Sequence, residues 1–124
     1  MKYSIHIDHN FKIIRYTHSG IINAEDIGEA WNKLLVMKEF TELKYNLLSD
    51  YRGGEFQMSL DFLPKLMEFM RAIKSIVRGK KQALIVDEPY SVAGSLLFEN
   101  EVNKEIGFLN KVFATETKAL EWLL

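Results

Sequence analysis

Short runs typical of β-strands alternate along this chain with segments typical of amphipathic helices, and this alternation limits the fold more than any other feature. Tyr3, Ile5 and Ile7 alternate with polar residues, which is the pattern of a half-buried strand. A turn over 8–10 and a second apolar run, FKIIRYTH (11–18), predict an antiparallel hairpin at the start of the chain.

Each later strand is predicted to be followed by a helix. Asn23 suits the N-cap position of a first helix over about 24–37, with acidic residues in its first turn. Three further pairs are YNLLS (45–49) with a helix capped by Ser59 or Asp61, QALIV (82–86) with a helix over roughly 90–103, and GFLNKVFA (107–114) with a helix capped by Thr115. The order ββαβαβαβα predicts an α/β fold, with four helices and a mixed five-stranded sheet whose first strand is antiparallel.

The composition fits a single globular domain over residues 1–124, because 48% of the residues are hydrophobic and only two are proline. The absence of cysteine excludes disulfides, thiolate metal sites and a cysteine nucleophile. With a net charge of −1, no overall field would attract nucleic acid or an anionic membrane. No apolar run has the length of a membrane helix and no leader-like segment occurs, so we expect a cytoplasmic protein without membrane insertion.

Four segments resemble the SpoIIAA-like (STAS/Sec14-like) small bacterial proteins, and together they span nearly the whole chain. They are HSGIINAEDI (18–27), the strand that ends in Asp50, ALIVDEPYSVAGSLLFE (83–99) and KVFATETKALEWLL (111–124). The resemblance implies an α/β fold that presents the loops after its strands on one face. Many members of this branch have no assigned activity.

The best-known relatives are anti-sigma-factor antagonists, in which a partner kinase phosphorylates a serine in an Asp-Ser-Ser/Thr-Gly loop. The corresponding segment here reads SDYRGGEFQMS (49–59) and lacks that motif. Ser49 precedes the aspartate instead of following it, and Ser59 is interpreted as a helix cap. The phosphorylation switch is therefore not transferred to this chain.

The loop that follows the predicted strand at 45–49 is the candidate ligand or partner loop. Asp50, Tyr51 and Arg52 lie where ligands of open α/β sheets bind, outside the carboxyl end of a strand. The alternative is an ordinary turn, in which Asp50 caps local backbone, Arg52 is solvated, and Gly53 and Gly54 supply positive φ. The ordinary turn is the preferred interpretation.

The predicted second helix has an unusually wide apolar arc. One stripe is expected to pack on the sheet: Phe62, Leu66, Phe69, Ile73, Ile76 and Val77. Leu63, Met67 and Met70 lie beside it and form the candidate interface or pocket face. The third helix, a second subunit or an apolar ligand would cover this face, and the sequence leaves these alternatives open.

The remaining polar clusters have ordinary interpretations. The three histidines of the hairpin, His6, His9 and His18, are interpreted as surface residues, so that no metal and no cofactor are expected. Five cations are interpreted as groups at the end of the second helix and in its exit turn that complement the helix dipole: Arg71, Lys74, Arg78, Lys80 and Lys81. No motif of nucleophilic or acid–base catalysis occurs.

Three functional hypotheses follow. The leading one is a non-catalytic regulatory or protein-interaction domain, homodimeric through the second or third helix, with an exposed apolar face. The second is a carrier of a small apolar ligand or lipid, with an enclosed cavity beside the second helix and Asp50, Tyr51 and Arg52 near its mouth. The third is an unrecognised enzyme, which needs titratable groups that converge in one cleft.

Overall fold

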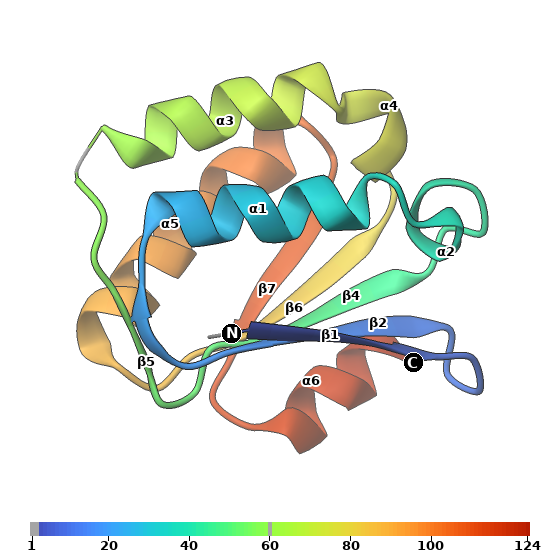
Figure 1. Ribbon diagram of the computed structural model, residues 1–124, viewed down its shortest axis with the longest axis horizontal. Helices are drawn as coiled ribbons and strands as arrows, with labels where there is room; N and C mark the ends of the chain where they lie inside the picture. Colours follow the sequence, from blue (N-terminus) through green and yellow to red (C-terminus); the bar gives the residue numbers. More distant parts are fainter. Residues whose placement is uncertain (1–2, 60) are drawn as a thin grey trace.

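Five strands form one mixed sheet in the computed structural model, which describes residues 3–59 and 61–124 (Figure 1). In spatial order they are β1 (Tyr3–Asp8), β2 (Ile13–His18), β4 (Asn46–Asp50), β6 (Lys81–Ile85) and β7 (Leu109–Phe113). β1 pairs with β2 antiparallel, and the other neighbours are parallel. The predicted mixed five-stranded sheet with an antiparallel first strand is therefore confirmed.

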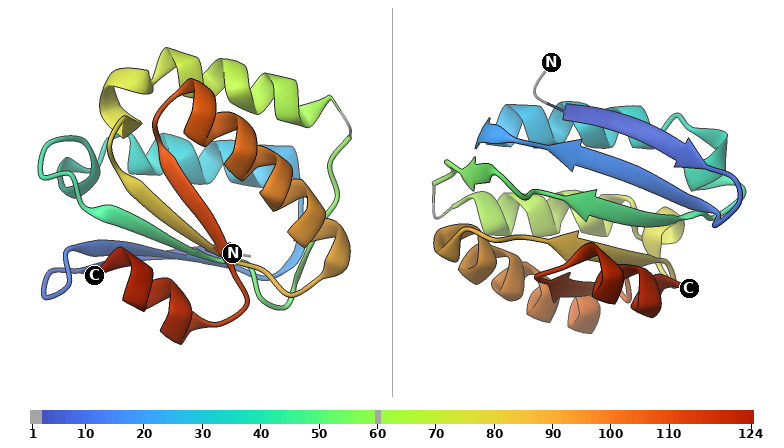
Figure 2. Two further views of the ribbon diagram at one scale, coloured as in Figure 1. Left: turned by 180° about the vertical axis from the view of Figure 1, so that it is seen from behind. Right: turned by 90° about the horizontal axis from the view of Figure 1, so that it is seen from below.

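The four predicted helices are present and cover the two faces of the sheet unequally. They are α1 (Ala24–Leu34), α3 (Phe62–Ala72), α5 (Pro89–Glu105) and α6 (Glu116–Leu123). α1, α3 and α5 lie on one face, and α6 lies on the other (Figure 2). Two of the predicted caps form, since Asn23 Oδ1 accepts a hydrogen bond from the backbone N–H of Asp26 at 2.9 Å and Thr115 Oγ1 from that of Lys118 at 3.3 Å. The predicted cap of α3 is wrong, because Asp61 occupies the N-cap position without a side-chain capping hydrogen bond and the Ser59 hydroxyl bonds to Asp61 instead.

The structure adds four short elements that the predicted order lacks. They are β3 (Gly20–Ile22), α2 (Lys38–Thr41), β5 (Gly54–Phe56) and α4 (Lys74–Val77). β3 and β5 pair parallel in a separate two-stranded sheet. Gly54 suits this pairing because an added Cβ would lie 2.6 Å from Ile22 Cδ1 and only 3.0 and 3.2 Å from the backbone carbonyl oxygens of Tyr51 and His18. Elements of three or four residues show too little periodicity to be recognised in a sequence.

The alternation of side chains along the strands divides the interior into two cores. Ile14, Tyr16, Leu47 and Leu84 belong to the larger core, on the side of α1, α3 and α5. Ile13, Leu48, Ala83 and Ile85 belong to the smaller core beneath α6. Both faces of the parallel strands are thus buried, as parallel sheets require.

The predicted orientation of α3 is wrong. Met67 and Met70, expected to lie beside the buried stripe, are its most buried residues, with 3% and 0% of their surface exposed. Phe62, Leu66 and Phe69 of the expected stripe are only half-buried. α3 packs against α1 and α5 instead of lying flat on the sheet, so residues on both sides of its apolar arc contact other helices.

Lys80, one of the five cations interpreted as complementing the helix dipole, is buried. Only 3% of Lys80 is exposed, and its Nζ donates a hydrogen bond to the carbonyl oxygen of Phe40. The ammonium lies 4.4 Å from the centroid of the Phe40 ring. Burial, assisted by the charge of Lys44, lowers the pKa of Lys80 to about 8.

This lowered pKa predicts how stability depends on pH. Below pH 8 the ammonium is charged in both states, and the full cost of burying it is present. Between pH 8 and the ordinary value of 10.5 the folded chain releases the proton while the unfolded chain keeps it. The free energy of unfolding of the wild type should therefore rise over this range relative to that of Lys80→Met, as measured by urea unfolding. A difference that stays constant from pH 7 to pH 10 would contradict the assignment.

Two neighbouring leucines test how α6 docks. Leu123 is 5% exposed in the smaller core, and Leu124 is 64% exposed. Leu123→Ala should cost about 2–5 kcal/mol in denaturant unfolding, and Leu124→Ala less than about 0.5 kcal/mol. Trp122 is half-buried against Phe113, so Trp122→Ala should cost less than the roughly 3–5 kcal/mol of a fully buried indole. Equal losses for the two leucines would contradict the docking of α6.

Candidate ligand-binding cavity

A cavity of about 250 Å³ lies between the sheet and the helices α1, α3 and α5. Its floor includes Gln82 and Leu84 of β6, and Trp31 of α1 forms part of one wall. Tyr90 and Leu97 of α5 belong to the lining but are 47% and 59% exposed, so they mark the mouth. No acidic or basic side chain and no histidine is in the lining among the described residues.

Small residues on α5 leave the cavity unfilled, and two hydrogen bonds hold the segments around it in place. Gly94 and Ser95 lie on the lining face of α5, where longer side chains would fill the volume. The backbone N–H of Phe56 donates to Ser91 Oγ at 3.2 Å, which joins β5 to the first turn of α5. The hydroxyl of Tyr90 donates to the carbonyl oxygen of Met58 at 3.2 Å and holds the segment that leads to α3.

The candidate interface or pocket face is buried inside the chain. Leu63 and Met70 line the cavity, and Met67 packs in the larger core beside them without lining the cavity. The sequence left three possibilities for what covers this face. In the structure, the chain's own core covers Met67, and the apolar cavity lies against Leu63 and Met70. An interface with a second copy through this face would require α3 to move.

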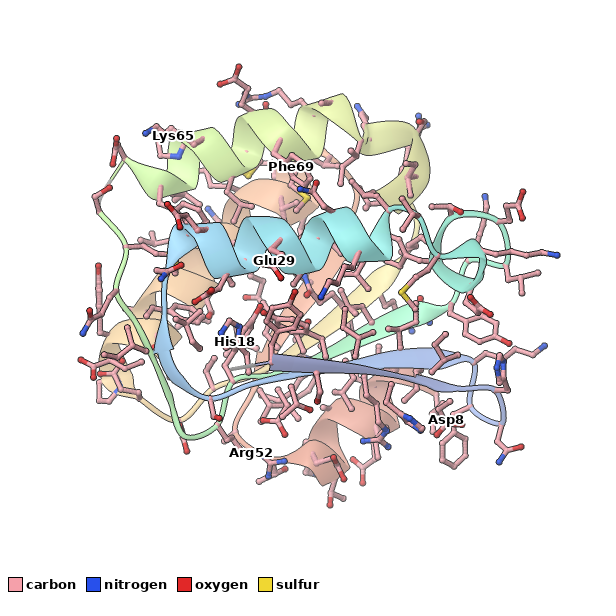
Figure 3. The ribbon with its side chains drawn as sticks, viewed as in Figure 1. Asp8, His18, Glu29, Arg52, Lys65 and Phe69 are labelled. Carbon is pink, nitrogen blue, oxygen red and sulfur yellow. The ribbon has the colours of Figure 1, made fainter. Side chains whose placement is uncertain are left out.

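The candidate loop is divided by the plane of the sheet. Tyr51 continues the alternation of β4 and lines the cavity. Arg52 lies on the opposite side of the sheet, near α6 (Figure 3), and Asp50 is paired with it. Arg52 Nε and Nη2 donate to Asp50 Oδ1 and Oδ2 at 2.9 and 2.6 Å, and the backbone N–H of Arg52 donates to Oδ1 at 3.1 Å. Of these three residues, only Tyr51 therefore belongs to the site. The alternation of side chains between the two faces of a strand was the sequence signal that separates Tyr51 from Asp50 and Arg52.

The ion pair between Asp50 and Arg52 changes the pKa of the Asp50 carboxyl group. Burial acts to raise the pKa of Asp50, but the hydrogen bonds and charge of Arg52 outweigh it and hold the pKa below its usual value. Gly53 has the predicted positive φ, +75°. The prediction is wrong for Gly54, which begins β5 and is not among the positive-φ glycines. Asp50 caps local backbone, which matches the ordinary-turn interpretation, whereas Arg52 is paired and not simply solvated.

A polar row crosses the floor of the larger core, and the sequence analysis missed it. Ser49 Oγ donates to Gln82 Oε1 at 2.6 Å, and Gln82 Nε2 donates to Asn110 Oδ1 at 2.5 Å. All three residues are at most 2% exposed. The signal was Gln82 itself, because a polar residue at the start of a strand buried on both faces needs a partner or a function.

The prediction that all three histidines lie at the surface holds for His6 and His9 and is wrong for His18. His18 is fully buried between the sheet and α1, where its Nδ1 forms a short hydrogen bond with the hydroxyl of Tyr16 (Figure 3). Its Nε2 lies 3.9 Å from Asp26 Oδ2. Position alone could not reveal this burial, because the last residue of a strand is often exposed.

An aromatic group connects this buried histidine with the cavity. Tyr51 packs edge-on against Tyr16 at 5.6 Å and against Phe56 at 5.0 Å between ring centroids. Burial raises the pKa values of both Tyr16 and Tyr51, so both phenols stay protonated at neutral pH. Among the described residues, no group of three or more acidic, histidine or cysteine side chains is placed to hold a metal ion.

Comparisons with known proteins identify the fold. No protein-family model matches the sequence, and no curated protein matches it significantly. The structure is similar to that of an uncharacterized protein from the DUF3478 family with a SpoIIAA-like fold, from Shewanella loihica PV-4, with a TM-score of 0.61. The match covers 98% of this chain and 92% of that chain at 15% identity, which confirms the predicted SpoIIAA-like fold and shows the fold alone.

The position of Arg52 outside the cavity leads to a prediction. The Asp50–Arg52 pair lies at the surface, with 43% of the Arg52 side chain exposed. Arg52→Ala should therefore lower the free energy of unfolding by less than about 1 kcal/mol and leave binding in the cavity unchanged. Tyr51→Ala removes a buried ring and should cost roughly 3–5 kcal/mol by analogy with other large aromatic side chains. Unfolding of the Arg52 variant at room temperature would contradict this placement.

Proposed function

We propose that this protein binds a small apolar molecule in the cavity between the sheet and α1, α3 and α5. The observation that carries the proposal is a space of about 250 Å³ whose lining is almost wholly apolar. An apolar cavity of about 150 Å³ already holds benzene, so this one has room for a bicyclic aromatic or an alkyl chain of similar volume. Ligand pockets of this kind, apolar with a few polar groups, are the usual sites of small-molecule binding.

The carrier hypothesis is preferred here over the interaction domain that led the sequence analysis. The interaction domain needs a continuous exposed apolar face on α3, and Met67 and Met70 are buried within one chain. Leu96 and Leu97 of α5 are 47% and 59% exposed, so a homodimer through this helix stays a prediction. None of the described helices has the length and apolar character to cross a membrane.

The proposal does not include catalysis. Tyr16, His18 and the half-buried Asp26 form a group of titratable side chains between the sheet and α1, yet none of them is in the cavity lining. A chemical step would need such groups in contact with the ligand. The expectation that the protein is not an enzyme stays a prediction.

A fluorescence titration with N-phenyl-1-naphthylamine, an uncharged apolar probe, tests the proposal. The chain has two tryptophans, and only Trp31 lines the cavity. In a Trp122→Phe background, bound probe should therefore quench Trp31 by energy transfer, with saturation at one probe per chain. Failure to quench Trp31 at the solubility limit of the probe would refute binding in the cavity.

Two glycines offer a matched pair of variants for this titration. Gly94 and Gly28 both lie within helices, and an added Cβ at either position meets no heavy atom within 4 Å. Only Gly94 lines the cavity, so Gly94→Phe should weaken probe binding about tenfold or more, because the loss of roughly 55 Å² of apolar contact costs about 1.4 kcal/mol. Gly28→Phe should leave the affinity unchanged. Equal affinities for both variants would place the probe elsewhere on the surface.

A further inference from the structure

Among the described residues, and apart from the phenol of Tyr51, two buried polar side chains interrupt the apolar lining of the cavity, and they come from different elements. Gln82 lies on β6 in the floor and is 2% exposed, and Ser95 lies on α5 and is 4% exposed. An alanine at position 95 would make this part of the lining apolar without any polar group to satisfy. Buried polar groups cost folding free energy unless they are hydrogen-bonded.

The amide of Gln82 is fixed in place and only half used. Ser49 Oγ donates to its Oε1, and its Nε2 donates to Asn110 Oδ1, so partners on both neighbouring strands orient the amide plane. A glutamine amide has two N–H donors and two acceptor lone pairs in its oxygen. One donor and one lone pair of this oriented group are therefore left for a molecule in the cavity.

Ser95 differs from the other serines near the cavity. The hydroxyl of Ser91 is bonded to Glu88, and that of Ser59 to Asp61. The hydroxyl of Ser95 has no hydrogen-bond partner among residues 3–59 and 61–124, although the residue is more than nine-tenths buried. A hydroxyl in this state, at the wall of a cavity, is a site where a ligand gains a hydrogen bond without displacing one inside the protein.

The charge of the lining limits the ligand further. A carboxylate or phosphate inside the cavity would lose its hydration without a cation to replace it, since no basic side chain is in the lining among the described residues. A neutral hydroxyl, carbonyl or amide needs only one or two hydrogen bonds. The lining therefore accommodates a neutral polar group and disfavours an ionised one.

We infer that the ligand is an uncharged molecule whose apolar body carries one hydroxyl or carbonyl group, and that this group bonds to the amide of Gln82 and the hydroxyl of Ser95. The inference rests on the proposed function, because it requires that the cavity binds a ligand. It adds the chemical class of the ligand and the two residues that select it.

Calorimetric titrations with two matched ligands test the inference. 2-Naphthol and 2-methylnaphthalene have nearly the same shape and differ in one hydrogen-bonding group. The two ligands also differ in hydration, which changes their affinities by the same factor in every variant. The ratio of their dissociation constants is therefore compared between the wild type and Ser95→Ala, so that this factor cancels. The ratio should shift against 2-naphthol by roughly three- to tenfold, the usual worth of one hydrogen bond. Ser59→Ala is the control, because Ser59 lines the cavity with its hydroxyl already bonded, and the ratio should not change.

Further measurements separate failure of the inference from failure of the proposed function. Gln82→Leu should shift the same ratio of dissociation constants in the same direction. If Gln82→Leu does not fold, Ser95→Ala still tests the inference. 2-Naphthoate should bind the wild type at least tenfold more weakly at pH 7.5 than 2-naphthol. Unchanged ratios in Ser95→Ala, or equal binding of 2-naphthoate, would overturn the inference and leave apolar binding intact. Absence of binding by both neutral naphthalenes would overturn the proposed function as well.

Discussion

The parallel pairing of β2, β4, β6 and β7 is the constraint on which the rest of this structure depends. Parallel strands are buried on both faces, so the chain must supply helices to each side of the sheet. It supplies them unequally, with α6 alone on one face and α1, α3 and α5 on the other. The single helix leaves a thin, closely packed core. The three helices form a thicker layer, and the cavity lies within that layer.

The long elements follow from periodicity, and the site does not. The hairpin, the Asn23 and Thr115 caps and the run QALIV are local patterns, so the sequence predicts the sheet and the four long helices. The orientation of α3 depends instead on which neighbours its wide apolar arc meets, and a sequence does not state this. Lys80 and His18 show the same limit, because their burial comes from α2 and α1 packing over them.

The candidate loop shows how a pattern can be read too coarsely. Asp50, Tyr51 and Arg52 are adjacent in sequence and were treated as one group. The two-residue period of β4 extends past its end, so Ser49 and Tyr51 share the cavity side while Asp50 and Arg52 pair on the other. The polar row of the larger core therefore comes from neighbouring strands, and of its members only Gln82 lines the cavity. Gln82 belongs to this row because the strand register places it beside Leu47 on β4 and beside Asn110 on β7.

The energetics of empty space favour a ligand over a packing defect. At about 24 cal/mol per Å³, a closed apolar void of the observed 250 Å³ would cost on the order of 6 kcal/mol. Folded domains have only about 5–15 kcal/mol of stability in total. The exposed rings and chains at the mouth, Tyr90 and Leu97, leave the space accessible, so a bound apolar molecule would regain the dispersion contacts that the lining lacks. Because the mouth is open, the cost of a closed void is not stored in the free protein, and a ligand is favoured instead by removing the apolar lining from contact with solvent.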